Sequence, residues 1–167
     1  MARPRQVRIP PPTSTAVHNV MAANRGTNTG PEGVLRRSLK SILVGGYRLN
    51  HGIAGVRVDL AFPSKRVAVL VNGCFWHHCP ACNLPLPKSH TAYWKAKFER
   101  NAERDKLNRA ELEAAGWSVI VIWEHELEAA PADCARRVKA ALGVLRRPGV
   151  VRGRVQGRVL EPGEEAA

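Results

Sequence analysis

Three cysteines lie close together in the middle of this 167-residue chain, with the spacing C-x4-C-x2-C at Cys74, Cys79 and Cys82. Structural zinc sites hold the ion in a tetrahedron of four thiolate or imidazole ligands, so the spacing indicates a zinc site that lacks one ligand. We expect the fourth to be His125, which follows an apolar strand-like run and would reach the same end of a sheet. His78, inside the loop, is the competing choice. A set of buried, reduced cysteines is the alternative without a metal.

A second possible metal site centres on Asp59, in the alternating run VRVDLAF. The next apolar run ends at Val71 and Asn72, beside the cysteine loop. A carboxylate with nearby carbonyl oxygens can hold Mg²⁺ while the ion keeps several waters, one of which can attack a phosphodiester. A single Asp in a strand is weak support, however. From the pattern alone, an ordinary surface Asp paired with Arg57 or Arg66 is the stronger interpretation.

The cysteine loop also carries Phe75, Trp76 and His77. Aromatic side chains on a metal-braced loop could wedge between base pairs, but they could equally cap the zinc site as a small core. Histidine side chains titrate near neutral pH and can move a proton to or from a reacting water. Taken alone, His77 is better interpreted as a supporting or surface histidine.

The elements that must position these residues follow the order helix, three strands, helix, strand, helix. Pro31 suits the first turn of a helix that Gly45 and Gly46 end. Apolar residues recur in it at helical spacing, at Val34, Leu35, Leu39, Ile42 and Leu43. A long charged helix is expected from about Thr91 to Ala115, and the last helix could be broken at Pro131.

Four short apolar runs have the composition of β-strands: YRLN, VRVDLAF, RVAVLVN and WSVIVIW. In VRVDLAF the apolar residues alternate with Arg57, Asp59 and Ala61, so we expect Asp59 to face away from the core. RVAVLVN is almost wholly apolar and should be a buried central strand. The elements together predict a mixed α/β sandwich.

The charge balance favours a polyanionic partner. Lys and Arg number 26 against 14 Asp and Glu, a net charge of +12, which indicates nucleic acid rather than a basic protein whose charge only keeps it dispersed. We expect one domain over residues 21–147, between a flexible basic arm at 1–20 and a flexible tail at 148–167. No run reaches the ~20 apolar residues of a membrane span and no secretion signal is visible, so an intracellular location without a membrane partner is expected.

In order along positions 21–125, the chain resembles the very-short-patch repair (Vsr) endonuclease family, within the restriction-endonuclease-like (PD-(D/E)XK) fold. The matching landmarks are Met21, Pro31-Glu32, VDLAFP around Asp59, GCFWH at 73–77, WKAKFERNAERD at 94–105 and GWSVIVIWEH at 116–125. The resemblance implies a three-layer core, in which helices flank a central mixed sheet, plus a structural zinc site.

The resemblance also implies roles for single residues. Asp59 matches the family's essential magnesium ligand, and Val71 falls where a main-chain carbonyl completes the metal shell. His77 matches the proposed general base, and Glu32 the acidic residue that helps hold metal-bound water. Cys74 and His125 occupy zinc-ligand positions. The residues that match DNA contacts are Met21, Phe75 and Trp76, which would enter the duplex, and Lys97, Asn101 and Arg104 on the charged helix.

The implied function is a Mg²⁺-dependent nick in one strand of double-stranded DNA. The cut would fall 5′ of a T mispaired with G and would start very-short-patch repair of deaminated 5-methylcytosine. A monomer in the bacterial cytoplasm, associated with the nucleoid and possibly with mismatch-repair proteins, fits that role. Two alternatives stay open: a defence or restriction-type nuclease of the same fold acting on unmismatched or modified DNA, and an inactive zinc-containing DNA-binding module.

Three positions depart from the family pattern. Val71-Asn72 stands where better-known members resemble Thr-His, so a hydroxyl and a second imidazole are missing; a carbonyl ligand survives this change, but a second proton-transfer role does not. Val58 replaces the usual Pro before the aspartate. Cys79 and Cys82 replace a His/Cys pair, a change that leaves zinc binding intact.

Overall fold

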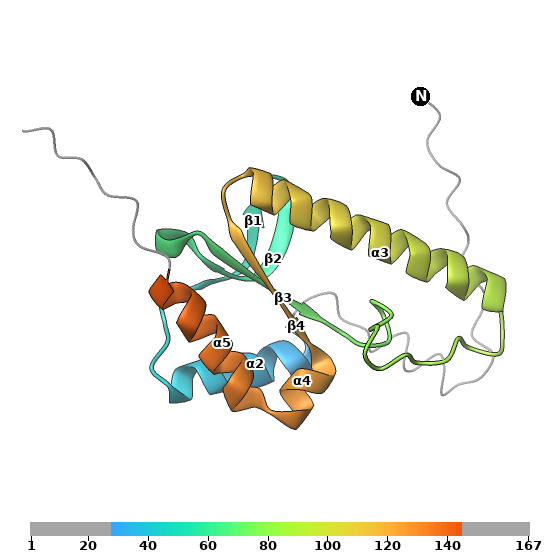
Figure 1. Cartoon of the computed structure of the whole chain (residues 1–167), viewed down its shortest axis with the longest axis horizontal. Coiled ribbons are helices and arrows are strands. Elements are labelled where there is room, and N and C mark those ends of the chain that lie inside the picture. The colour runs from blue at the N-terminus through green and yellow to red at the C-terminus, as the bar shows by residue number, and fades with distance from the viewer. Residues whose placement is uncertain (1–27, 145–167) are drawn as a thin grey trace, which may run out of the picture.

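The computed structural model describes residues 28–144, and within them four strands form one mixed sheet in the order β1-β2-β3-β4 (Figure 1). β1 (Arg48–Ile53) pairs antiparallel with β2 (Val56–Phe62), and β2 pairs antiparallel with β3 (Val67–Asn72). β3 and β4 (Ser118–Trp123) are parallel. Parallel neighbours need a long crossover, which here includes the cysteine loop, with Cys74, Cys79 and Cys82, and the helix α3 (Thr91–Ala114).

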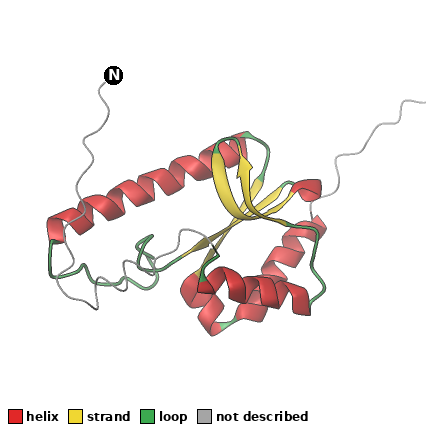
Figure 2. Ribbon diagram, turned by 180° about the vertical axis from the view of Figure 1, so that it is seen from behind, coloured by secondary structure: helices red, strands yellow, loops and turns green. Residues whose placement is uncertain are grey.

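Helices cover both faces of the sheet (Figure 2). α3 lies on one face, where its fully buried Leu112 packs with apolar residues of β1, β2 and β3. The other face is covered by α2 (Gly30–Ser41), α4 (Glu124–Ala129) and α5 (Pro131–Val144). Leu35 and Leu39 of α2 and Val138 of α5 form the main core there with Leu60 and Val69. The expected mixed α/β architecture is therefore confirmed.

The structure corrects the expected pattern of β2. Val56 and Val58 pack on the α3 side, whereas Leu60 and Phe62 belong to the cluster under α2 and α5. Ala61, expected on an outward face, is fully buried. The alternating apolar residues therefore do not share one face, because helices cover both sides of this strand. Asp59 lies at the position where the packing changes from one cluster to the other.

α2 starts and stops close to the predicted positions. Its N-terminus is closed by a capping box: Glu32 accepts hydrogen bonds from the main-chain N–H groups of Asn28 and Thr29, which precede the helix, and the Thr29 side chain meets the backbone of the first turn. The helix ends at Ser41, and Leu43 beyond it is 94% exposed. Leu43 was expected on the apolar stripe, and that expectation was wrong because the helix stops two residues earlier.

The remaining helices match the predicted pattern, with α5 beginning at Pro131 directly after α4. The proposed arm at 1–20, the tail at 148–167 and Met21 lie outside the described residues. Within the described part, no helix combines the length and the apolar character that a membrane span requires.

Candidate metal centre and active-site groove

Cys74, Cys79, Cys82 and His125 form one compact cluster, whose ligand atoms all lie within 4.8 Å of one another. His125 Nδ1 lies 3.2 Å from Cys74 Sγ and 3.6 Å from Cys79 Sγ. Three thiols and one imidazole are a donor set of structural zinc sites, so the cluster fits zinc. His78 is not part of it, since its ring stacks on Phe98 with centroids 5.2 Å apart. His125 is therefore the fourth member.

The sheet explains how residues 51 positions apart meet. β3 and β4 are parallel with Asn72 opposite Trp123, so the loop after β3 and the start of α4 leave the same edge. There the Cys74 N–H donates to a carboxylate oxygen of Glu124 at 3.0 Å, and the His125 N–H points at Cys74 Sγ at 3.4 Å. Sequence reasoning missed Glu124, which anchors the backbone of the loop.

The crowding of the thiols shows why a cation belongs here. Burial and the hydrogen bonds of Cys74 and Cys79 raise the pKa of the Cys82 thiol to about 12. Without a positive charge, three neighbouring thiolates would repel one another, and only a bound cation allows all of them to ionise together.

An ion pair on the far side of α4 supports the same corner. The Arg137 guanidinium of α5 donates to both carboxylate oxygens of Glu126, at 2.7 and 3.2 Å, and to the Val121 carbonyl of β4 at 2.8 Å. Glu126 in turn accepts the Trp123 N–H at 2.7 Å. These bonds join α5, α4 and β4 beside His125, so they hold the zinc ligand's helix against the sheet.

Asp59 is partly buried, and its Oδ2 accepts the Val71 N–H at 2.7 Å. Burial raises the pKa of Asp59 to about 6; the nearby Glu32 carboxylate also raises it, while the Val71 N–H and His77 lower it. Because burial disfavours the charged form of this carboxyl group, a bound divalent cation would stabilise that form. Asp59 therefore has the electrostatic character of a metal ligand.

Glu32 is 4% exposed, yet its carboxylate is already engaged in its own helix. It accepts the N–H groups of Asn28 and Thr29, both at 3.0 Å, and the Thr29 hydroxyl at 2.9 Å. Its charge acts on Asp59, and both residues line one groove. The fold thus brings Glu32 to the site, with part of its hydrogen-bonding capacity used for helix capping.

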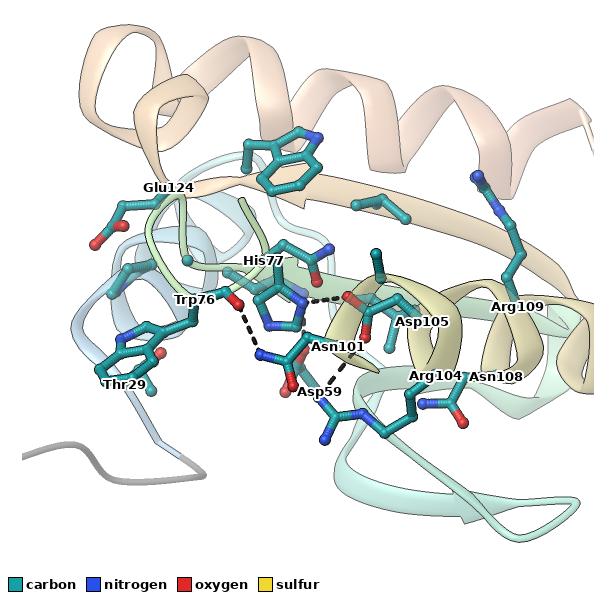
Figure 3. A pocket seen from close by; sticks show the side chains of 18 of the residues that line it. Thr29, Asp59, Trp76, His77, Asn101, Arg104, Asp105, Asn108, Arg109 and Glu124 are labelled. Carbon is teal, nitrogen blue, oxygen red and sulfur yellow. Dashed lines mark hydrogen bonds and ion pairs between the residues drawn. The ribbon is translucent and has the colours of Figure 1, made fainter. Parts of the chain in front are cut away.

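His77 is held from behind by α3. Its Nδ1 pairs with the carboxylate of Asp105, and Asn101, one turn earlier, donates to the Trp76 carbonyl at 2.8 Å. The dashed lines in Figure 3 mark both contacts. Sequence reasoning missed Asp105. Its signal was the four-residue spacing from Asn101, which places both side chains on one face of a helix.

Phe75 and Trp76 pack against α3 instead of standing free. The Phe75 ring lies 5.4 Å from both Trp94 and Phe98, and the Lys97 ammonium lies 5.3 Å from the Trp76 ring. Both aromatic side chains are partly buried. The pair therefore forms a small aromatic cluster with α3, and its role as a wedge in DNA stays a prediction.

One groove of about 1580 Å³ contains most of the predicted catalytic and DNA-contacting residues. Figure 3 shows it from close by. The predicted residues that line it are Glu32, Asp59, Val71, Trp76, His77, Lys97, Asn101 and Arg104. The cysteine cluster adjoins the groove, since Gly73 and Glu124, which precede Cys74 and His125, line it. The groove can thus hold a divalent cation, a proton-accepting imidazole and basic side chains together.

Known proteins share this chain's sequence pattern. A family model described as DNA mismatch endonuclease Vsr matches residues 13–83. The chain is 38% identical over 125 residues to the type II nicking enzyme V.NaeI of Lentzea aerocolonigenes, covering 70% of this chain and 72% of that protein. It is 42% identical over 111 residues to the type II nicking enzyme V.XorIIP of Xanthomonas oryzae pv. oryzae, covering 65% and 79%.

The DNA mismatch endonuclease Vsr of Escherichia coli is 30% identical over 93 residues, covering 54% of this chain and 60% of that protein. The two nicking enzymes are thus more similar to this chain than the Escherichia coli protein is. Since these matches include the strand with Asp59 and the cysteine loop as the structure arranges them, the chain belongs to the Vsr family and is a DNA nicking endonuclease.

Proposed function

We propose that this protein nicks one strand of duplex DNA with Mg²⁺ held at Asp59 and His77 as the proton-transfer group. The observation that carries the proposal is the shared groove, where a carboxylate with a raised pKa lies with an imidazole fixed by Asp105. Proton transfer and cation binding each promote the attack of water on a phosphodiester at neutral pH.

Asp59 and the main-chain carbonyl of Val71 would hold the cation, with Glu32 beside the waters around it. A bound Mg²⁺ supplies charge stabilisation at the phosphate and lowers the pKa of water. The Val71 N–H keeps Asp59 oriented through its hydrogen bond. Asn72 brings no second imidazole, so the proposal assigns proton transfer to His77 alone.

His77 is oriented for this role by its pairing. Asp105 holds Nδ1, which leaves Nε2 as the ring nitrogen that can exchange a proton with water or a leaving oxygen. The carboxylate also stabilises the imidazolium that forms when His77 accepts a proton. The zinc cluster fixes the loop that carries His77, so the distance between the base and Asp59 depends on zinc.

The first candidate substrate is duplex DNA without a mismatch. The relatives with the higher identities are named type II nicking enzymes, a name that does not specify mispaired bases. The basic wall of the groove, with Lys97 and Arg104, suits the phosphate backbone of any duplex.

The second candidate is DNA nicked 5′ of T in a T:G mismatch, which would start repair of deaminated 5-methylcytosine. The matching family model is described as a mismatch endonuclease, and Trp76 lies at the groove. Inserting an aromatic ring between bases costs about a few kcal/mol per step and less beside a mismatch, so such a wedge would favour damaged sites.

A nicking assay separates these candidates. Matched, T:G-mismatched and cytosine-methylated duplexes of one sequence are incubated with the zinc-loaded protein, with and without Mg²⁺. We expect Mg²⁺-dependent nicks in one strand, and the ratio of rates on the three duplexes identifies the substrate. The proposal is wrong if Asp59→Ala cuts as fast as the parent protein.

A further inference from the structure

The groove continues past the catalytic residues to an end for which the sequence indicated no contact with DNA. There its walls are the β1–β2 hairpin, with Gly55 in the turn and Arg57 at the start of β2, and the second half of α3, with Lys106, Asn108 and Arg109. We refer to these five residues as the distal end of the groove.

The packing places the distal end away from the aromatic pair. The first half of α3 lies beside the cysteine loop, since Phe98 contacts Phe75. The second half lies beside the β1–β2 hairpin, since Leu112 packs with Val56 and Val58. Asp59 and His77 therefore lie between two separate regions, one aromatic and one basic.

The charges of the distal end are all of one sign. Its ionisable groove-lining residues are Arg57, Lys106 and Arg109, whereas the acidic residues of the groove belong to α2, the middle of β2, the middle of α3 and the start of α4. Arg57 and Lys106 are exposed. Arg109 has a side chain that is 50% exposed, and its pairing with Glu113 at 3.4 Å is a weak surface contact. These three side chains can therefore bind an anionic ligand without breaking a strong contact.

The dimensions fit a stretch of duplex. From Asp105, which pairs with His77, to Arg109, α3 advances four residues, or about 6 Å along its axis, and Arg57 lies two residues from Asp59 along β2, or about 7 Å. B-form DNA rises about 3.4 Å per base pair along each strand, so these lengths correspond to about two base pairs. Figure 3 shows Arg104, Asn108 and Arg109 following one another along the helix.

We propose that the distal end is a second DNA-backbone site, in which Arg57 and Arg109 bind phosphates of the duplex about two base pairs from the nick. The inference rests on the proposed function, because it assumes that the duplex lies along this groove. The phosphate is the group that guanidinium recognises, so the site would set affinity and position without reading base sequence.

The first test measures the salt dependence of binding to a labelled matched duplex without added Mg²⁺. Arg57→Gln and Arg109→Gln should each weaken binding about three- to fivefold near 0.1 M salt. Each should also reduce the slope of log affinity against log salt by about 1. The control is Arg136→Gln, which removes an exposed arginine of α5 that also pairs within its own helix, with Asp133. Equal losses in the control would overturn the site.

The second test uses the duplex that the parent protein nicks, shortened one base pair at a time from either end. The parent should lose affinity when the distal side falls below about two base pairs from the nick. Arg57→Gln/Arg109→Gln should no longer respond to shortening at that side, while its response at the other side stays unchanged. A double variant that responds like the parent at both sides refutes the proposal.

Failure of the proposed function gives a different result. If Asp59 plays no part in cutting, the nicking rate of Asp59→Ala stays at the parent level, while the salt slopes of the arginine variants are unaffected by that outcome. If the arginine variants bind as the parent does but Asp59→Ala is inactive, the proposed function stands and the second backbone site is wrong.

Discussion

The cysteine cluster, which fits zinc, and the Asp59 region, which we propose holds Mg²⁺, are of opposite construction. The cluster has a full set of four ligand atoms within 4.8 Å, all from one loop and the first turn of α4. The Asp59 region is an open groove, where the neighbours of Asp59 come from α2, β3, the loop and α3. A complete shell suits a cation that stays, whereas an open shell leaves positions for water and substrate. The comparison implies that one site maintains structure and the other performs chemistry.

Replacing Asp59 should lower the nicking rate more than any other change, while it raises the free energy of unfolding. Asp59→Asn removes the charge that holds Mg²⁺, so the nicking rate should fall by about a thousandfold or more. The folded protein should become more stable by about 1–3 kcal/mol at pH 7, because the raised pKa of Asp59 shows that its charge is costly to bury. Single-turnover nicking and thermal unfolding measure both, with the exposed Asp133→Asn as control. A variant that is inactive and less stable would contradict the separation between the two sites.

Removing a ligand from the cysteine cluster should instead destabilise the fold. Cys79→Ser should release zinc and lower the unfolding temperature, since structural zinc contributes roughly 10–16 kcal/mol of apparent free energy in zinc-finger peptides. Cys134→Ser is the matched control, because Cys134 is equally buried but lies in the core beneath α2. Zinc content by mass spectrometry and unfolding by circular dichroism check this. The four-ligand assignment is wrong if both variants keep one zinc.

Changing the partner of His77 should have an intermediate effect. Asp105→Asn keeps the shape of the side chain but removes the charge that orients and stabilises the imidazolium, so the nicking rate should fall about 10- to 100-fold. Zinc content and DNA affinity should stay near the parent values. Glu103→Gln, an exposed position of the same helix, should change none of the three. A loss of zinc in Asp105→Asn would mean that the residue supports the cluster instead of the reaction.

Stability and nicking should depend on pH in opposite directions through the titration of Asp59. Since the pKa of Asp59 is about 6 in the folded protein and 3.8 in the reference state, the folded state binds more protons between these values. Stability contributed at this position is therefore greatest below pH 4, falls as pH rises to 6 and is constant above it. The nicking rate should instead rise with pH: at limiting Mg²⁺ it should fall about tenfold for each pH unit below pH 6. Raising Mg²⁺ should shift this midpoint downwards; an unchanged midpoint contradicts Asp59 as the ligand.

The smallest expected effect concerns the support behind the cluster. Arg137→Met removes the bonds to Glu126 and Val121 that join α5, α4 and β4. Zinc should then be released a few-fold faster to a competing chelator, with the resting zinc content unchanged. Arg137→Lys should release zinc at a rate between those of the parent and Arg137→Met, because an ammonium cannot form the two parallel bonds of a guanidinium. Identical release rates for all three proteins would show that the ion pair does not support His125.

Sequence patterns alone predicted the parts of this protein that depend on local spacing. The element order, the central strand and the break before Pro131 follow from periodicity and from the backbone limits of proline and glycine. The cysteine spacing likewise indicated zinc before any geometry, and the choice of His125 followed from the expectation that two strands end at one edge. These features need only residues near one another in the chain, or one parallel strand pair.

Only the tertiary structure decided what depends on contacts between distant elements. Ala61 is buried against the expectation because α3 covers the face of the sheet opposite α2, α4 and α5. Asp105 became the partner of His77 through the packing of α3, and Arg57 came to share a groove with Arg109 although 52 positions separate them. Side-chain type specifies what a residue can do, but the burial and partners that direct it arise from packing across the whole domain.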